Sequence, residues 1–138
     1  MNTLLSQQSM ESKKLRGLAA FVVAASLLAG CAGLVPKAPE EAVKERAQAR
    51  WDALVKGDLP AAYEYFSPGS REGFSLQSYE NTIRKGFWKK AEVKQVKCES
   101  SERCQATIGI EYEFQGRRTP TGLQESWIKE GGKWWVVR

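Results

Sequence analysis

Residues 104–114 alternate apolar and polar side chains without interruption. The positions of one parity are apolar: Cys104, Ala106, Ile108, Ile110, Tyr112 and Phe114. Those of the other parity are polar or small: Gln105, Thr107, Gly109, Glu111 and Glu113. Because successive side chains of a strand point to opposite faces of a sheet, this period predicts a strand with one face on a core and one in solvent. The chain is therefore expected to form a sheet that is covered on one side.

The segments around this strand also have strand character. Residues 88–98 carry apolar side chains that change from odd to even positions, which predicts a β-bulge between Val93 and Val96. The elements expected after residue 114 are, in order, a polar loop, a strand, a tight glycine hairpin and a last strand: 115–121, 123–129, Gly131-Gly132 and 133–138.

The preceding part of the chain has a helical period. Residues 40–56 place one apolar stripe along a helix, formed by Val43, Ala47, Trp51, Leu54 and Val55. Asp58 is the expected cap of a second short helix. A break is expected at residues 67–70, and Ser75 is the expected cap of a third helix that ends near Lys85.

Helices followed by an antiparallel meander predict the α+β class. We expect N-terminal helices packed on a curved antiparallel sheet of about four strands, in a single globular domain over residues 40–138.

The segment before this domain has the features of an export signal. Lys13, Lys14 and Arg16 precede an apolar run at residues 18–29, which is shorter than the about 20 residues that a membrane-spanning helix needs. The run ends in Leu28-Ala29-Gly30-Cys31, which resembles the lipobox of bacterial lipoproteins. The alternative is an alanine-rich core helix with a chance cysteine at its end. Initiation at Met1 or at Met10 stays open.

The lipobox resemblance implies lipidation of Cys31 with diacylglycerol and an N-acyl chain, and cleavage just before it. Residues 1–30 are then a lipoprotein signal peptide, and residues 31–39 are the lipidated cysteine and a short tether of about 25 Å. Because Ala32 rather than Asp follows the cysteine, the sorting rule of enteric bacteria favours the outer membrane, facing the periplasm, if the host has two membranes. Apart from this lipid, no cofactor is expected.

The two other cysteines are separated by five polar residues between strand-like runs. A hairpin there would place Cys98 and Cys104 opposite each other, and exported proteins meet an oxidising environment, so we expect a disulfide. A redox-active or metal-binding pair is the alternative, although the spacing is not CxxC.

The 138 residues include no histidine, which removes the commonest general base and metal ligand. No metal site is expected, and no residue is assigned a catalytic role. A basic stretch follows the third helix, formed by Arg84, Lys85, Lys89, Lys90, Lys94 and Lys97. Outside the cytoplasm this stretch fits a solvated face, anionic lipid head groups or acidic glycans, and no nucleic-acid partner is expected.

The domain resembles the nuclear-transport-factor-2-like, or cystatin-like, superfamily of α+β cones. The resemblance rests on WDALVKGD at 51–58, AAYEYFSP at 61–68, Trp127, and GGKWWVV at 131–137. The superfamily includes isomerases, dehydratases and cyclases as well as non-catalytic binding and dimerisation domains, so the fold does not decide the function. It implies acid/base candidates in the cone, namely Asp52, Tyr63, Tyr65, Tyr79, Glu111 and Tyr112. Asp52 lies off the apolar stripe and Glu111 on the polar strand face, which favours solvated or structural roles for both.

Four aromatic residues are candidates for a ligand or interface surface: Trp127, Trp134, Trp135 and Tyr63. Adjacent Trp134 and Trp135 must point to opposite faces of a strand, so one of them is expected in the core. The expected function is a lipid-anchored, non-enzymatic envelope protein that binds a partner protein, a small apolar ligand or a second copy of itself. The alternatives are a small acid/base enzyme that uses Asp or Glu with Tyr, and a structural envelope attachment factor.

Overall fold

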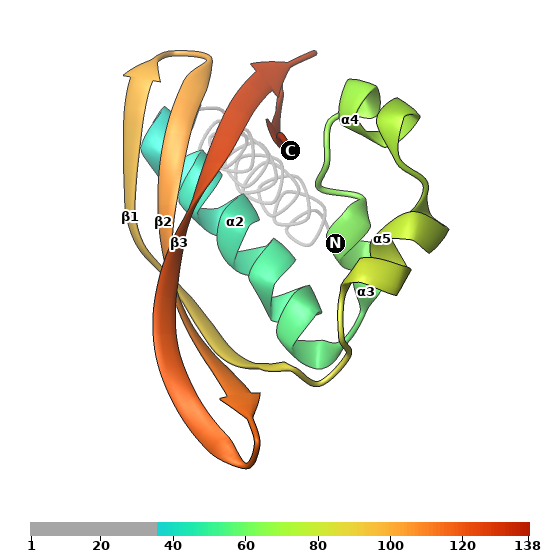
Figure 1. Ribbon diagram of the computed structural model, residues 1–138. Helices are drawn as coiled ribbons and strands as arrows, with labels where there is room; N and C mark the ends of the chain where they lie inside the picture. The colour runs from blue at the N-terminus through green and yellow to red at the C-terminus, as the bar shows by residue number, and fades with distance from the viewer. Residues whose placement is uncertain (1–35) are drawn as a thin grey trace, which may run out of the picture. The chain divides into compact units, whose positions relative to one another are not determined.

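The computed structural model describes residues 36–138 (Figure 1). The predictions for the signal peptide and for Cys31 lie outside these residues. No helix within the described part of the chain is both long and apolar enough to cross a membrane.

The described residues form helices first and an antiparallel sheet second. The helices are α2 (Pro39–Lys56), α3 (Leu59–Tyr63), α4 (Pro68–Gly73) and α5 (Leu76–Thr82). The strands are β1 (Trp88–Ser100), β2 (Arg103–Phe114), β3 (Arg117–Glu130) and β4 (Lys133–Val136), paired in the order β1-β2-β3-β4. The α+β class and the curved four-stranded sheet are confirmed.

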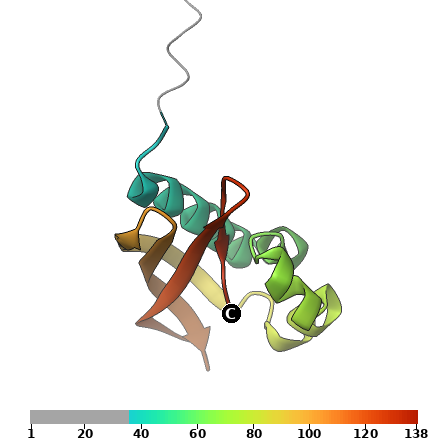
Figure 2. The same ribbon diagram turned by 90° about the horizontal axis from the view of Figure 1, so that it is seen from above.

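Helix α2 covers one face of the curved sheet, and the three short helices are grouped beyond its C-terminal end (Figures 1 and 2). Its apolar stripe is buried, with Val43 and Ala47 fully enclosed and Trp51 and Leu54 nearly so. The helix ends at Gly57, whose φ of 77° is readily adopted only by glycine. Backbone bonds from Gly57 to Leu54 and from Asp58 to Ala53 satisfy the last carbonyl groups.

The sheet has the register that the sequence pattern predicts. Residue Lys94 is unpaired between the pairs of Val93 and Gln95 with β2, so the predicted bulge is confirmed. A disulfide joins Cys98 and Cys104, which are direct partners in this register. Gly131 and Gly132 both have positive φ angles and form the tight turn into β4.

The core lies between α2 and the inner face of the sheet. The inward positions of β2 are buried from Cys104 to Ile110, as the alternation predicts. The prediction fails at the end of the strand, where Tyr112 is half-buried and Phe114 is 54% exposed. Strand β2 ends in a hairpin that extends beyond the C-terminal end of α2 (Figure 1), so this helix does not cover the last residues of the strand.

Three predicted boundaries are wrong. Residues 67–70, predicted as a break, also begin a new helix: Ser67 caps α4 by accepting a hydrogen bond from the Ser70 N–H (3.1 Å). The third helix ends at Thr82 rather than near Lys85, since the chain turns at Gly86 with φ 76°. The predicted loop 115–121 is mostly part of β3.

Strand β3 contains Pro120 at a position where only one of its two sides is paired with another strand. Pro120 pairs with Glu111 on β2, whereas β4 pairs only with residues 127–130 of β3. The other side of Pro120 therefore has no neighbouring strand that needs its missing N–H.

The end of α2 provides a stability prediction. Gly57→Ala should lower the free energy of unfolding by about 1 kcal/mol, because an alanine at φ 77° is strained. Gly73→Ala is the matched control, since its added Cβ meets nothing within 4 Å and its φ is not positive. Urea denaturation of both variants checks this, and equal midpoints for the two would contradict it.

Candidate functional site

Three of the four aromatic candidates are core residues. Trp127 is 0% exposed, Trp134 4% and Tyr63 8%. The Tyr63 hydroxyl donates to the carbonyl of Phe74 (2.8 Å), and its ring packs edge-to-face on the Phe74 ring. Only Trp135 reaches the surface, and it points away from Trp134 as the alternation requires.

Trp135 lies beside a second aromatic ring. The segment 65–67 runs parallel to β4 through a bridge between Phe66 and Val136. The Val136 N–H donates to the Tyr65 carbonyl (2.9 Å), and the next bond runs from Ser67 to Val136 (3.2 Å). This pairing places Tyr65 and Trp135 at neighbouring positions on the same face.

Cationic side chains surround these two rings. The Arg46 guanidinium lies 4.9 Å from the centre of the Tyr65 ring and 5.7 Å from that of Trp135. Arg71 and Lys133 approach the Trp135 ring to 5.9 and 4.6 Å. The Arg46 Nε donates to the Trp134 carbonyl (2.7 Å), which fixes its position. Burial lowers the pKa of Arg46, although a guanidinium stays charged at neutral pH. We call these five residues the Trp135 surface.

The other acid/base candidates are not brought together. Asp52 is exposed on α2 and accepts a bond from the Gln48 amide (2.9 Å). Glu111 lies at an outer position of β2, and the Tyr112 ring stacks on Phe87 at 4.9 Å. Tyr79, on α5, is buried, and its ring centre lies 5.7 Å from that of Tyr63 in the core. The structure therefore gives these candidates separate surroundings rather than one site.

A buried ion pair that the sequence analysis did not select joins α2 to β3. Arg50 donates through Nη1 to Oε1 of Glu125, and both side chains are only 8% exposed. The Trp51 indole N–H donates to the same carboxylate oxygen (3.0 Å). The Arg50 guanidinium also lies over the Phe66 ring at 5.1 Å, so its charge is enclosed by aromatic and carboxylate groups.

The sequence contains the periodic positions from which this pair could have been found. Arg50 follows Ala47 by three residues and precedes Leu54 by four, which places it on the apolar stripe of the helix. Glu125 has the same parity as Trp127 on its strand, which is the core parity. Two opposite charges at core positions of different elements indicate a buried ion pair, because burying either charge without a partner costs too much free energy.

The environment of Glu125 opposes its ionisation. Burial raises the pKa of this carboxyl group, while the Arg50 charge and the Trp51 donor act in the opposite direction. Burial likewise raises the pKa of the Tyr79 hydroxyl. Four buried polar atoms of the ion pair, Tyr79 and Trp127 have no hydrogen-bond partner within the described residues. They are Arg50 Nε, Glu125 Oε2, Tyr79 Oη and Trp127 Nε1.

A carboxyl group with a raised pKa beside a phenol is a group that general acid or base catalysis can use. The contacts of Glu125 with Arg50 and Trp51 fix it as a link between helix and sheet.

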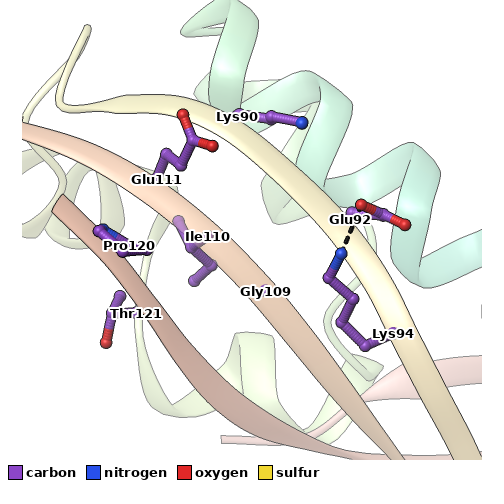
Figure 3. A pocket seen from close by; sticks show the side chains of 8 residues that line it. All are labelled: Lys90, Glu92, Lys94, Gly109, Ile110, Glu111, Pro120 and Thr121. Atoms are coloured by element: carbon purple, nitrogen blue, oxygen red, sulfur yellow. Dashed lines mark hydrogen bonds and ion pairs between the residues drawn. The ribbon is translucent and has the colours of Figure 1, made fainter. Parts of the chain in front are cut away.

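A hollow of about 230 Å³ lies on the outer face of the sheet (Figure 3). Gly109, which pairs with Gly122 on β3, contributes no side chain to this hollow. The Lys94 side chain lies over Gly109, where an added Cβ would come within 2.8 Å of Cε, and its ammonium group pairs with Glu92 (2.6 Å). Two charges of the rim therefore neutralise each other. No group of three or more potential metal-ligating side chains occurs within residues 36–138.

The comparisons with known proteins define the fold. No family model matches the chain, and no curated protein matches it. A solved SEC-C motif-containing protein from Rhodopseudomonas palustris aligns with a TM-score of 0.59 at 14% identity, over 75% of this chain and 79% of that one. A second SEC-C motif-containing protein, from Psychrobacter arcticus, aligns with a TM-score of 0.61 at 13% identity, over 79% of this chain and 64% of that one.

An NTF2-like protein from Campylobacter jejuni aligns with a TM-score of 0.54 at 11% identity, over 70% of this chain and 97% of that one. NTF2-like stands for nuclear-transport-factor-2-like. At these identities the likeness establishes the fold alone, and the described domain has an NTF2-like fold.

The buried pair provides a prediction with a defined pH dependence. Arg50→Met leaves Glu125 buried without its cation, which should cost about 3–5 kcal/mol of unfolding free energy at neutral pH. The loss should shrink at acid pH, because a protonated Glu125 carries no charge. Denaturation curves at several pH values measure this.

The sign follows from proton linkage. When the folded-state pKa of Glu125 is raised, its contribution to stability falls as the pH rises from the ordinary glutamate value through the raised one. Arg50→Met raises that pKa further, so its deficit must grow with pH. The control Arg50→Met/Glu125→Gln removes the titrating group and should lose this dependence. A deficit of Arg50→Met that does not change with pH would refute the assignment.

Proposed function

We propose that this protein is a lipid-anchored lipoprotein of the bacterial cell envelope, and that its NTF2-like domain is a non-enzymatic module that binds a partner protein or a small apolar ligand. The observation that carries the proposal is the basic and apolar leader ending in Leu28-Ala29-Gly30-Cys31. Acyl chains on Cys31 would hold the mature chain on a membrane, since two lipid signals suffice for stable anchoring.

The spacing between the cysteine and the domain supports this arrangement. Residues 32–38 separate Cys31 from the start of α2 at Pro39. An extended tether of this length reaches about 22 Å, which keeps the domain near the bilayer. In a host with two membranes, Ala32 after the lipidated cysteine favours the outer membrane, with the domain in the periplasm.

The disulfide supports an oxidising compartment. Cys98 and Cys104 are paired across the β1–β2 hairpin. Structural disulfides persist in the periplasm and outside the cell and are rare in the bacterial cytoplasm.

The surface chemistry supports binding. The Trp135 surface presents two half-exposed aromatic rings with Arg46, Arg71 and Lys133 around them. Tryptophan, tyrosine and arginine are the residues that most often dominate protein interfaces. The role of a structural attachment factor would use the basic stretch from Arg84 to Lys97 instead.

A small acid/base enzyme is the second candidate, and one observation favours it. Glu125 combines burial with a raised pKa and is near the buried Tyr79 hydroxyl. Its ion pair with Arg50 argues for a structural role. An activity of this class would disappear in Glu125→Gln while membrane attachment stayed unchanged.

The anchor is tested by substitution of the cysteine. In a bacterium that expresses the full chain, the protein should incorporate labelled palmitate and fractionate with membranes, whereas Cys31→Ser should remain unlabelled. Cys98→Ser/Cys104→Ser is the matched control and should still be labelled. A natural-sequence protein that is soluble and unlabelled would rule out the proposal.

Export is tested by the oxidation state of the hairpin. Protein extracted from cells in the presence of a thiol-alkylating reagent should carry no alkyl group on Cys98 or Cys104, because both are bonded in the envelope. Peptide masses before and after reduction measure this. Full alkylation without reduction would place the protein in a reducing compartment.

A further inference from the structure

An aromatic hollow lies at the end of the sheet where β1 begins and β2 ends. It has a volume of about 330 Å³ and is lined by Thr82, Ile83, Arg84, Phe87, Trp88 and Phe114. We call this group the distal patch. The ring centre of Trp88 lies 5.5 Å from that of Trp51, which is in the C-terminal half of α2. The patch is therefore far from the N-terminal start of that helix (Figure 1).

The patch is apolar, exposed and firmly supported. Phe114, at 54% exposure, is the large apolar side chain that stands out on the surface of the described residues. Phe87 stacks on Tyr112 at 4.9 Å and meets Trp88 edge-on at 4.7 Å. The Glu113 N–H donates to the Phe87 carbonyl (3.0 Å), which attaches the segment between α5 and β1 to β2. Rigid, exposed aromatic groups of this kind are typical of binding surfaces.

Several cationic residues lie next to the patch in the chain or in the register of the sheet. The Lys89 ammonium group lies 3.7 Å from the Glu113 carboxylate, so the charge of this carboxylate is already balanced. Arg117 and Arg118 follow on the hairpin, opposite Phe114 and Glu113 in the register. Four cations near the patch make no ion pair among residues 36–138: Arg84, Lys85, Arg117 and Arg118. The charge around the hollow is therefore complementary to a negative partner.

We infer that the distal patch docks an acidic peptide segment of a partner protein, with one large apolar side chain of that segment in the hollow. The inference rests on the proposed partner-binding role and names where and what the domain binds. A hollow of about 330 Å³ has room for a single side chain such as phenylalanine or leucine. The surrounding cations would face carboxylates on either side of it.

The patch and the point where the chain enters the domain lie at opposite ends of α2. Helix α2 has 18 residues and is about 27 Å long, and the tether reaches about 22 Å from Cys31 to its start. The patch lies beside the C-terminal half of this helix, because Trp88 packs on Trp51 there, and the cations next to it favour an acidic partner.

The test uses purified full-length protein and a labelled probe peptide with a central phenylalanine flanked by glutamate and aspartate. Fluorescence anisotropy should show saturable binding that weakens as salt is added. Peptides with a central alanine, or with lysine in place of the acidic residues, should bind at least about tenfold more weakly. Phe114→Ser and Arg84→Glu should each reduce affinity on the order of tenfold.

Lys97→Glu, an exposed change at the opposite end of β1, is the matched charge control and should leave binding unchanged. Arg84 is exposed, so Arg84→Glu keeps the test valid even if Phe114→Ser unfolds. Absent binding, or binding that both patch variants retain, would overturn the inference. So would patch-dependent binding to phosphatidylglycerol vesicles without binding of the peptide. Cys31→Ser protein lacks the lipidation site but keeps the patch, so it should still bind the peptide. Its binding therefore tests the patch independently of the lipid anchor.

Discussion

The packing of α2 across the curved sheet determines where the other parts of the domain lie. Its apolar stripe fills the inner face, and the buried pair of Arg50 and Glu125 fixes the helix to β3. The Schellman-type end at Gly57 then directs the chain into the short helices. The first of these, α3, leads into segment 65–67, which pairs with the edge of β4 and brings Tyr65 beside Trp135. Both candidate surfaces therefore depend on this one helix–sheet contact.

Local patterns predicted the parts of the fold that depend on local rules. The stripe of α2, the alternation of β2, the bulge after Val93 and the glycine turn into β4 all follow from side-chain period or backbone conformation. Helix α4 was missed because Ser67-Pro68 is a helix start as well as a break. The length of β3 was missed because Pro120 opposes strand pairing except at an open edge, and edges are set by topology.

The candidate site was predicted in part, for a comparable reason. Alternation showed that Trp134 and Trp135 diverge, and the structure identifies Trp135 as the exposed one. The cations around it come from α2, α4 and β4, so no local pattern could assemble them. Composition alone does not indicate the Arg50–Glu125 pair, because most charged side chains are solvated, although both positions have the periods of the core. Beside its hydrophobic core, the domain thus has a buried ion pair and an aromatic patch at the end of the sheet where β2 ends.

The proposed function depends on the attachment of this domain to the envelope by lipid on Cys31. The most direct test is the mass of the N-terminal peptide of full-length protein extracted with detergent from the membranes of a bacterium that expresses it. If the protein is a lipoprotein, this peptide begins at Cys31 and carries a diacylglyceryl group and an N-acyl chain. A chain that begins at Met1 or Met10, with a free thiol on Cys31, would contradict it.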